Sequence, residues 1–144
     1  MDPPIKRLTL PASTGSIAVF RDFVRVGAMA AGIADNEIGK LDLVLEEILI
    51  NVARYAYTPD TGSVEVAYAE AGSNKLRLEI ADFGRVFNPL EVNPPDLSRG
   101  LADRPIGGLG VFLVRNMVDS LSYRREDGRN ILSFTFPLDG GPGD

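Results

Sequence analysis

The segment from residue 35 to residue 57 constrains the fold of this chain most strongly, because it has the pattern of a long helix with little polar surface. Asp35 is a typical N-cap residue, and Pro59, within Thr-Pro-Asp-Thr-Gly, ends the pattern. The second half of the segment is apolar almost all round. A helix of this kind has to be buried on most sides, so the segment predicts a helix packed against a sheet.

Four alternating segments predict that sheet. Residues 63–70 and 75–81 alternate apolar with polar side chains on either side of a short loop, which is typical of a hairpin. Residues 121–125 and 130–136 predict a second hairpin, whose loop contains the turn signal Asp127-Gly128. A further short strand is expected at residues 6–11. The stripes expected to share one face are Val64, Val66 and Tyr68 with Leu76, Leu78 and Ile80.

Two more helices are expected. The first follows the possible cap residues 13–16 and ends near Gly32, and the other begins near Gly110. The first helix is expected to have an apolar face of Ile17, Val19, Phe20, Phe23, Val24 and Val26, with Arg21, Asp22 and Arg25 on the other side. The order of elements predicts an α+β fold: a two-layer α/β sandwich whose mixed, mostly antiparallel sheet carries the helices on one face.

Composition narrows the class of protein. With 144 residues, of which 44% are apolar and 24% charged, the chain suits one globular domain at residues 1–138, and residues 139–144 are expected to be a disordered tail. It has no cysteine and no histidine, which excludes disulfides, thiolate metal sites and histidine-based catalysis. A net charge of −5 argues against direct nucleic-acid binding. The sequence predicts neither a signal peptide nor a membrane span, so a cytoplasmic protein is expected.

Two sets of polar residues stand out against this apolar background. Glu47 and Asn51 are four residues apart, so they lie on one helix face. They either serve a site or belong to a solvated face. Asp82 ends an apolar strand and Gly84 follows it, so the carboxylate can accept a hydrogen bond from a ligand's amine while the glycine allows close approach. An Asx turn at the strand exit is the alternative.

A glycine cluster, Gly107-Gly108-Leu109-Gly110, leads directly into the last helical pattern. Free N–H groups and the positive end of a helix dipole make such a junction suitable for a phosphate, although glycines there can also serve only a tight turn. Before it, residues 90–106 show no period and contain several prolines. A loop of this length inside a compact domain is typically functional or mobile.

Taken in order, Glu47-x-x-x-Asn51, Asp82-x-Gly84 and Gly107-Gly108-x-Gly110 resemble the N, G1 and G2 boxes of the ATPase superfamily shared by gyrase, histidine kinases and MutL. Within that superfamily the chain is most similar to the anti-sigma-factor serine kinases. The resemblance covers nearly the whole chain and implies the Bergerat ATP-binding fold, which agrees with the predicted sandwich.

The resemblance also implies a role for each residue. Asn51 would coordinate Mg²⁺, Glu47 would act as the general base, and Asp82 would bind the adenine amine with Gly84 close to the base. Many relatives have a threonine that assists adenine recognition where Asn130 lies in this chain. The residues implied to hold the phosphates are Gly107, Gly108, Leu109 and Gly110, with residues 90–106 as the ATP lid.

The function implied is that of an ATP-binding protein serine kinase. It would phosphorylate a small antagonist of an anti-sigma factor and sequester a sigma factor or a similar regulator. Relatives form homodimers through the face around the first strand and helix. Three alternatives stay open: a nucleotide-dependent protein-binding switch with little turnover, a histidine-kinase catalytic domain acting on a histidine in another chain, and a nucleotide-free scaffold.

Overall fold

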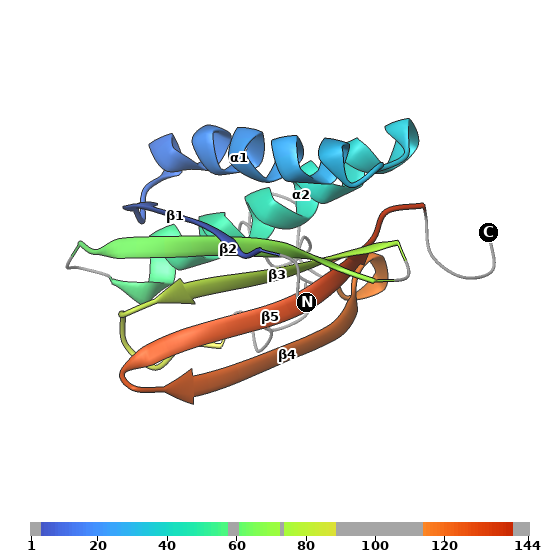
Figure 1. The fold of residues 1–144 in the computed structure, drawn as a ribbon. Helices are drawn as coiled ribbons and strands as arrows, with labels where there is room; N and C mark the ends of the chain where they lie inside the picture. Colours follow the sequence, from blue (N-terminus) through green and yellow to red (C-terminus); the bar gives the residue numbers. More distant parts are fainter. Residues whose placement is uncertain (1–3, 58–60, 73, 89–113, 140–144) are drawn as a thin grey trace, which may run out of the picture.

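The computed structural model describes residues 4–57, 61–72, 74–88 and 114–139. Its centre is a five-stranded sheet with the strand order β1-β2-β3-β5-β4, and helices α1 and α2 lie together on one face of it (Figure 1). The predicted α+β sandwich with helices on one face is therefore confirmed. All four strand pairings in the described ranges are antiparallel, so no parallel pair of the expected mixed sheet is found there.

Each predicted strand forms, with ends that differ by two residues at most. The strands are β1 (Lys6–Pro11), β2 (Ser63–Ala71), β3 (Lys75–Asp82), β4 (Asp119–Glu126) and β5 (Arg129–Pro137). The turn between β4 and β5 places both Asp127 and Gly128 at positive φ, 53° and 76°. This backbone is the one that tight two-residue hairpins favour, and it fixes the register of the second hairpin.

The side chains of the sheet that face the helices form most of the core. Val66 pairs with Ile80, which pairs with Leu132, and the next row pairs Tyr68 with Leu78 and Phe134. Of these only Tyr68 is not fully buried. Because side chains alternate along a strand, the predicted stripes share the face that packs on α1 and α2.

Helix α2 (Asp35–Asn51) supplies the other side of the core and extends into a π-helical turn, η2 (Val52–Ala56). The long helix was predicted, but the wider turn at its end was not. The N-cap is Ala34 rather than the predicted Asp35, which is the first helical residue and makes no side-chain cap. No helix in the described ranges is long and apolar enough to cross a bilayer.

Helix α1 (Ile17–Ala30) differs most from expectation. Phe20 and Val24 are buried as predicted, but Val19 and Val26 are 49% and 68% exposed. The two arginines expected on the solvent side instead reach α2: Arg21 pairs with Glu46 at 3.5 Å, and Arg25 pairs with Asp42. The helix packs on α2 as well as on the sheet, so its buried arc is rotated towards the arginines. Neither Ser13 nor Ser16 makes a side-chain cap.

Candidate functional site

The carboxylate of Asp82 is the fixed point of the candidate site. Asp82 ends β3 and is only 3% exposed. Its Oδ1 accepts hydrogen bonds from the backbone N–H of Gly84 and from Nδ2 of Asn130, both at 2.9 Å. Asn130 lies directly opposite Asp82 in the pairing of β3 with β5. The register of the sheet therefore brings Asn130 next to Asp82 and Gly84, which the sequence predicted as one feature.

Asn130 supports this carboxylate and leaves no donor for a ligand. A side-chain amide has two N–H donors, and Nδ2 uses them on Oδ1 of Asp82 and on the carbonyl of Arg85, at 2.7 Å. Its Oδ1 accepts from Phe87 N at 3.1 Å, Tyr123 Oη at 2.7 Å and Arg125 Nη1 at 3.1 Å. These contacts position Asp82, and the predicted contact of Asn130 with a nucleotide stays a prediction.

Burial and hydrogen bonding act against each other on the charge of Asp82. Burial raises the pKa of Asp82 above its ordinary value of 3.8, while the hydrogen bonds from Asn130 and Gly84 and the charge of Arg125 lower it. Both hydrogen bonds from the described residues go to Oδ1. The arrangement therefore leaves Oδ2 to accept a hydrogen bond from an amine of a ligand.

Glu47 and Asn51 form a second polar pair, one turn apart on α2. Asn51 is fully buried, and neither its Oδ1 nor its Nδ2 has a hydrogen-bond partner among the described residues. Oε2 of Glu47 is buried and unpaired in the same sense. Buried polar atoms nearly always have partners, so three unpaired atoms on neighbouring turns indicate a site that a ligand completes.

The chemistry of this pair fits a hard cation and a base. The amide oxygen of Asn51 suits Mg²⁺, which is commonly held by one or two protein oxygens together with phosphates of a substrate. Among the described residues no group of three His, Cys, Asp or Glu side chains could hold a metal ion, so water and phosphate oxygens would supply the other ligands. Burial raises the pKa of the Glu47 carboxyl, as does the charge of Glu46, against a smaller lowering by Arg54. A raised pKa makes a carboxylate a better proton acceptor near neutral pH.

The end of α2 joins the two halves of the site. Tyr57 accepts a hydrogen bond from Phe83 N at 2.7 Å and donates one to the carbonyl of Ser63 at 2.5 Å. The carbonyl of Ala56 accepts from Arg85 N at 2.9 Å. The helix that carries Asn51 is thus bonded to the turn that carries Asp82, and π-helical widening of this kind is frequent at functional sites.

Gly84 is required by this junction. A Cβ at this position would lie 2.2 Å from the carbonyl oxygen of Ala56, which is backbone and cannot rotate away. We expect Gly84→Ala to lower the free energy of unfolding by about 1–3 kcal/mol, as overpacking does. Urea unfolding would measure the loss. Gly72→Ala is the matched control, because a Cβ there meets nothing within 4 Å; equal effects of the two substitutions would contradict the explanation.

The predicted phosphate loop (Gly107, Gly108, Leu109 and Gly110) and the predicted lid at residues 90–106 lie outside the described residues. Their roles stay predictions. Just after them, residues 114–117 are helical, and Val114 is buried in the core.

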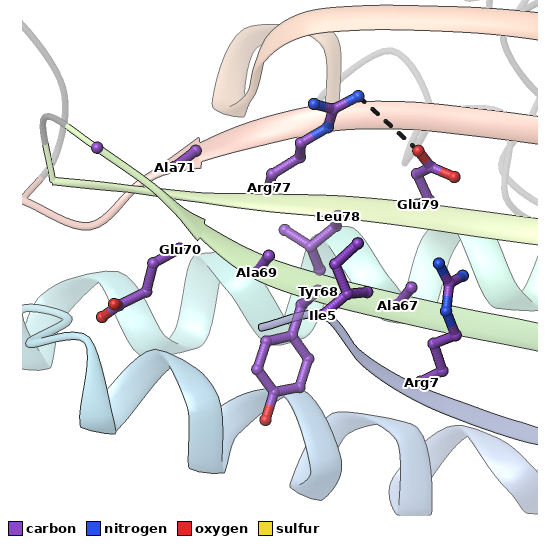
Figure 2. A pocket seen from close by; sticks show the side chains of 11 residues that line it. Ile5, Arg7, Ala67, Tyr68, Ala69, Glu70, Ala71, Arg77, Leu78 and Glu79 are labelled. Carbon is purple, nitrogen blue, oxygen red and sulfur yellow. Dashed lines mark ion pairs between the residues drawn. The ribbon is translucent and has the colours of Figure 1, made fainter. Parts of the chain in front are cut away.

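A pocket of about 470 Å³ lies elsewhere, over strands β1 to β3, and Figure 2 shows its lining. Arg7, Tyr68 and Arg77 contribute to it, and Arg77 pairs with Glu79 across its wall at 3.9 Å (Figure 2). None of the predicted site residues in the described ranges lines this pocket. It is therefore separate from the candidate site.

Two residues of the site were missed at the level of sequence. Arg125 donates from Nη1 to the carbonyl of Gly84 at 2.9 Å and to Oδ1 of Asn130 at 3.1 Å. A usable signal existed, because a two-residue turn at Asp127-Gly128 places position 125 opposite position 130. Tyr57 had no such signal, since its role depends on a helix end meeting a distant strand.

Comparison with known proteins settles the family. Residues 10–136 match the family described as "Histidine kinase-like ATPase domain". The chain belongs to this family. Such a domain binds ATP, in agreement with the resemblance found in the sequence.

Named relatives of this histidine kinase-like ATPase domain are protein kinases. The serine-protein kinase RsbW of Bacillus thuringiensis is 25% identical over 129 residues, which cover 87% of this chain and 80% of the relative. The serine/threonine-protein kinase BtrW of Bordetella bronchiseptica is 35% identical over 95 residues, 66% of this chain and 67% of the relative. The predicted membership of the anti-sigma-factor serine kinase family, a class of ATP-dependent protein kinases, is confirmed.

Solved structures agree on the fold of the ATPase domain. The RsbU and RsbW domains of Rv1364c from Mycobacterium tuberculosis superpose with a TM-score of 0.63 at 20% identity, covering 94% of this chain and 32% of that one. The blue-light activated histidine kinase EL346 of Erythrobacter litoralis gives a TM-score of 0.56 at 18% identity, covering 86% of this chain and 40% of that one. At these identities the likeness concerns the fold alone.

Proposed function

We propose that the chain is an ATP-dependent protein serine kinase that phosphorylates a small antagonist protein and, with nucleotide bound, sequesters a sigma factor or a similar regulator. The observation that carries the proposal is that Glu47 and Asn51 have buried polar atoms without hydrogen-bond partners among the described residues. The segment that follows their helix is hydrogen-bonded, through Tyr57, to the turn after Asp82. The relatives named as serine kinases support the same reading.

The two ends of the site have separate tasks in this proposal. Oδ2 of Asp82 accepts a hydrogen bond from the exocyclic amine of adenine, while Oδ1 stays bound to Gly84 and Asn130. The amide oxygen of Asn51, buried and without a partner among the described residues, would hold Mg²⁺. Mg²⁺ bound there would supply charge stabilisation for phosphoryl transfer. The hydrogen bond from Phe83 N to the Tyr57 hydroxyl would keep Asp82 at a fixed distance from Asn51.

Glu47 acts on the attacking group. The serine oxygen of the partner forms a bond to the γ-phosphorus as the bond from that phosphorus to the β,γ-bridging oxygen breaks, and ADP leaves. The proton of the serine hydroxyl passes to the Glu47 carboxylate, whose buried Oε2 has no other partner among the described residues. Positioning and charge stabilisation supply most of the catalysis of phosphoryl transfer, so one base beside a metal site suffices.

The proposal is tested with proteins that co-purify with the chain, incubated with Mg²⁺ and ATP labelled at the γ-phosphate. We expect label on a serine of a small partner, found by mass spectrometry, and none with Glu47→Ala. Label on a histidine would support the histidine-kinase alternative. Partner binding that depends on ATP without any covalent label would overturn the kinase proposal in favour of a nucleotide-dependent switch.

We also propose that the chain forms a homodimer through the face around β1 and α1. Exposed large apolar side chains are concentrated there: Ile5 is 56% exposed, Val19 49%, Val26 68% and Met29 60%. β1 is in addition an edge strand, which invites pairing with another chain. Sedimentation that shows only monomer over the whole accessible concentration range would contradict this.

A further inference from the structure

One row of the sheet has three polar members, whereas the row beside it is apolar apart from the hydroxyl of a tyrosine. Reading across the strands, Val66, Ile80, Leu132 and Tyr123 pair in succession and pack towards the helices. The next row pairs Val64, Asp82, Asn130 and Arg125 in the same order. Arg125 thus lies on the side of β4 that continues the candidate site, two strands from Asp82.

Arg125 bonds to both supports of the Asp82 carboxylate. Its Nη1 donates to the carbonyl of Gly84, whose N–H is bonded to Asp82, and to Oδ1 of Asn130, whose Nδ2 is bonded to Asp82. The arginine therefore fixes the turn and the amide at once. The groups that act on the Asp82 charge are Asn130 from β5, the N–H of Gly84 and then Arg125 from β4, with the hydroxyl of Tyr57 nearby, just after η2.

We propose that Arg125 is a positioning residue that sets the base specificity of this site, by holding the turn at Gly84 and the amide of Asn130 so that the Asp82 carboxylate stays oriented to select adenine over guanine. The inference rests on the proposed nucleotide site. An ionised carboxylate only accepts hydrogen bonds, so it pairs with the amino group of adenine and repels the oxo group of guanine at the same ring position. A carboxylate that is no longer held towards this ring position loses the discrimination.

Binding of ATP and GTP to Arg125→Met and to the wild type tests this, with Mg²⁺ present. We expect the affinity of Arg125→Met for ATP to fall about tenfold, and its preference for ATP over GTP to fall by a similar factor, the size of one charge-assisted hydrogen bond. Arg125→Lys keeps the charge without the fork of donors, so it should recover part of the preference.

Arg124→Met is the matched control. Arg124 precedes Arg125 on β4 but bonds to Glu126 at 2.8 Å and to Ser133 at 3.2 Å, on the other face of the sheet. Arg124→Met should therefore leave the preference for ATP over GTP unchanged. A folded Arg125→Met protein with the wild-type preference would overturn the inference while leaving the proposed function intact. A wild-type chain that binds neither nucleotide would overturn both.

Discussion

Replacing Glu47 with glutamine is expected to lower the rate of phosphate transfer by about 10²–10⁴-fold, the range for loss of a general base. Glutamine keeps the size of the side chain and its place on α2 but cannot accept the serine proton. The affinity for ATP should stay within about threefold of the wild-type value, because Glu47 acts on the attacking hydroxyl rather than on the nucleotide. Single-turnover transfer rates and equilibrium titration with ATP separate the two effects.

Glu46 provides the control and a pH test for the same prediction. It is adjacent, forms the ion pair with Arg21 at 3.5 Å, and raises the pKa of Glu47 through its charge. A general base must be ionised, so the rate should rise as pH increases through the raised pKa of Glu47. Glu46→Gln should retain transfer and move this rise to lower pH. A full rate in Glu47→Gln would remove Glu47 from the mechanism.

Asp82→Asn is expected to weaken ATP binding by about 10²-fold, while the folded protein without nucleotide becomes more stable. The asparagine oxygen can still accept from Gly84 and Asn130, but the amide that replaces Oδ2 now presents a donor to the amine of adenine. The affinity for ATP is measured by titration. Unchanged affinity would show that Asp82 does not bind the base.

The gain in stability should depend on pH in a defined direction. Because the native pKa of Asp82 lies above its ordinary 3.8, protonation favours the folded wild type at low pH, and this contribution is lost as pH rises through the raised value. Asp82→Asn has no carboxyl to ionise. Its advantage over the wild type should be largest above the raised pKa of Asp82 and should shrink as pH falls to the ordinary value, which unfolding measurements across that window would detect.

The sequence predicted the fold best where structure is local. The strand at residues 6–11 and the Asp127-Gly128 turn follow from alternation and turn chemistry alone. The orientation of α1 did not, because its ion pairs from Arg21 and Arg25 depend on where α2 lies. Apolar periodicity shows that a helix has a buried face, but the neighbours decide which part of a broad apolar arc is covered, and Val26 was left exposed.

The candidate site was also predicted only in part from the sequence. Glu47, Asn51 and Asp82 stood out because carboxylates and amides are costly in apolar segments, and the structure places them at the two ends of one helix–turn junction. The sequence predicted Asn130 as a nucleotide contact, which stays a prediction, but it did not predict that Asn130 also supports Asp82 through its amide donors. That supporting role depends on hydrogen-bond partners, which spacing along the chain does not reveal.

Calorimetric titration with ATP, in the presence of Mg²⁺ and in excess chelator, tests most directly the claim that Asn51 and Asp82 are two ends of one nucleotide site. For the wild type we predict one ATP per chain and a loss of affinity of at least about tenfold without Mg²⁺. Asn51→Ala should bind ATP with nearly the same weakened affinity in both conditions. A Mg²⁺ effect on ATP affinity in Asn51→Ala as large as in the wild type, or no ATP binding by the wild type, would contradict the claim.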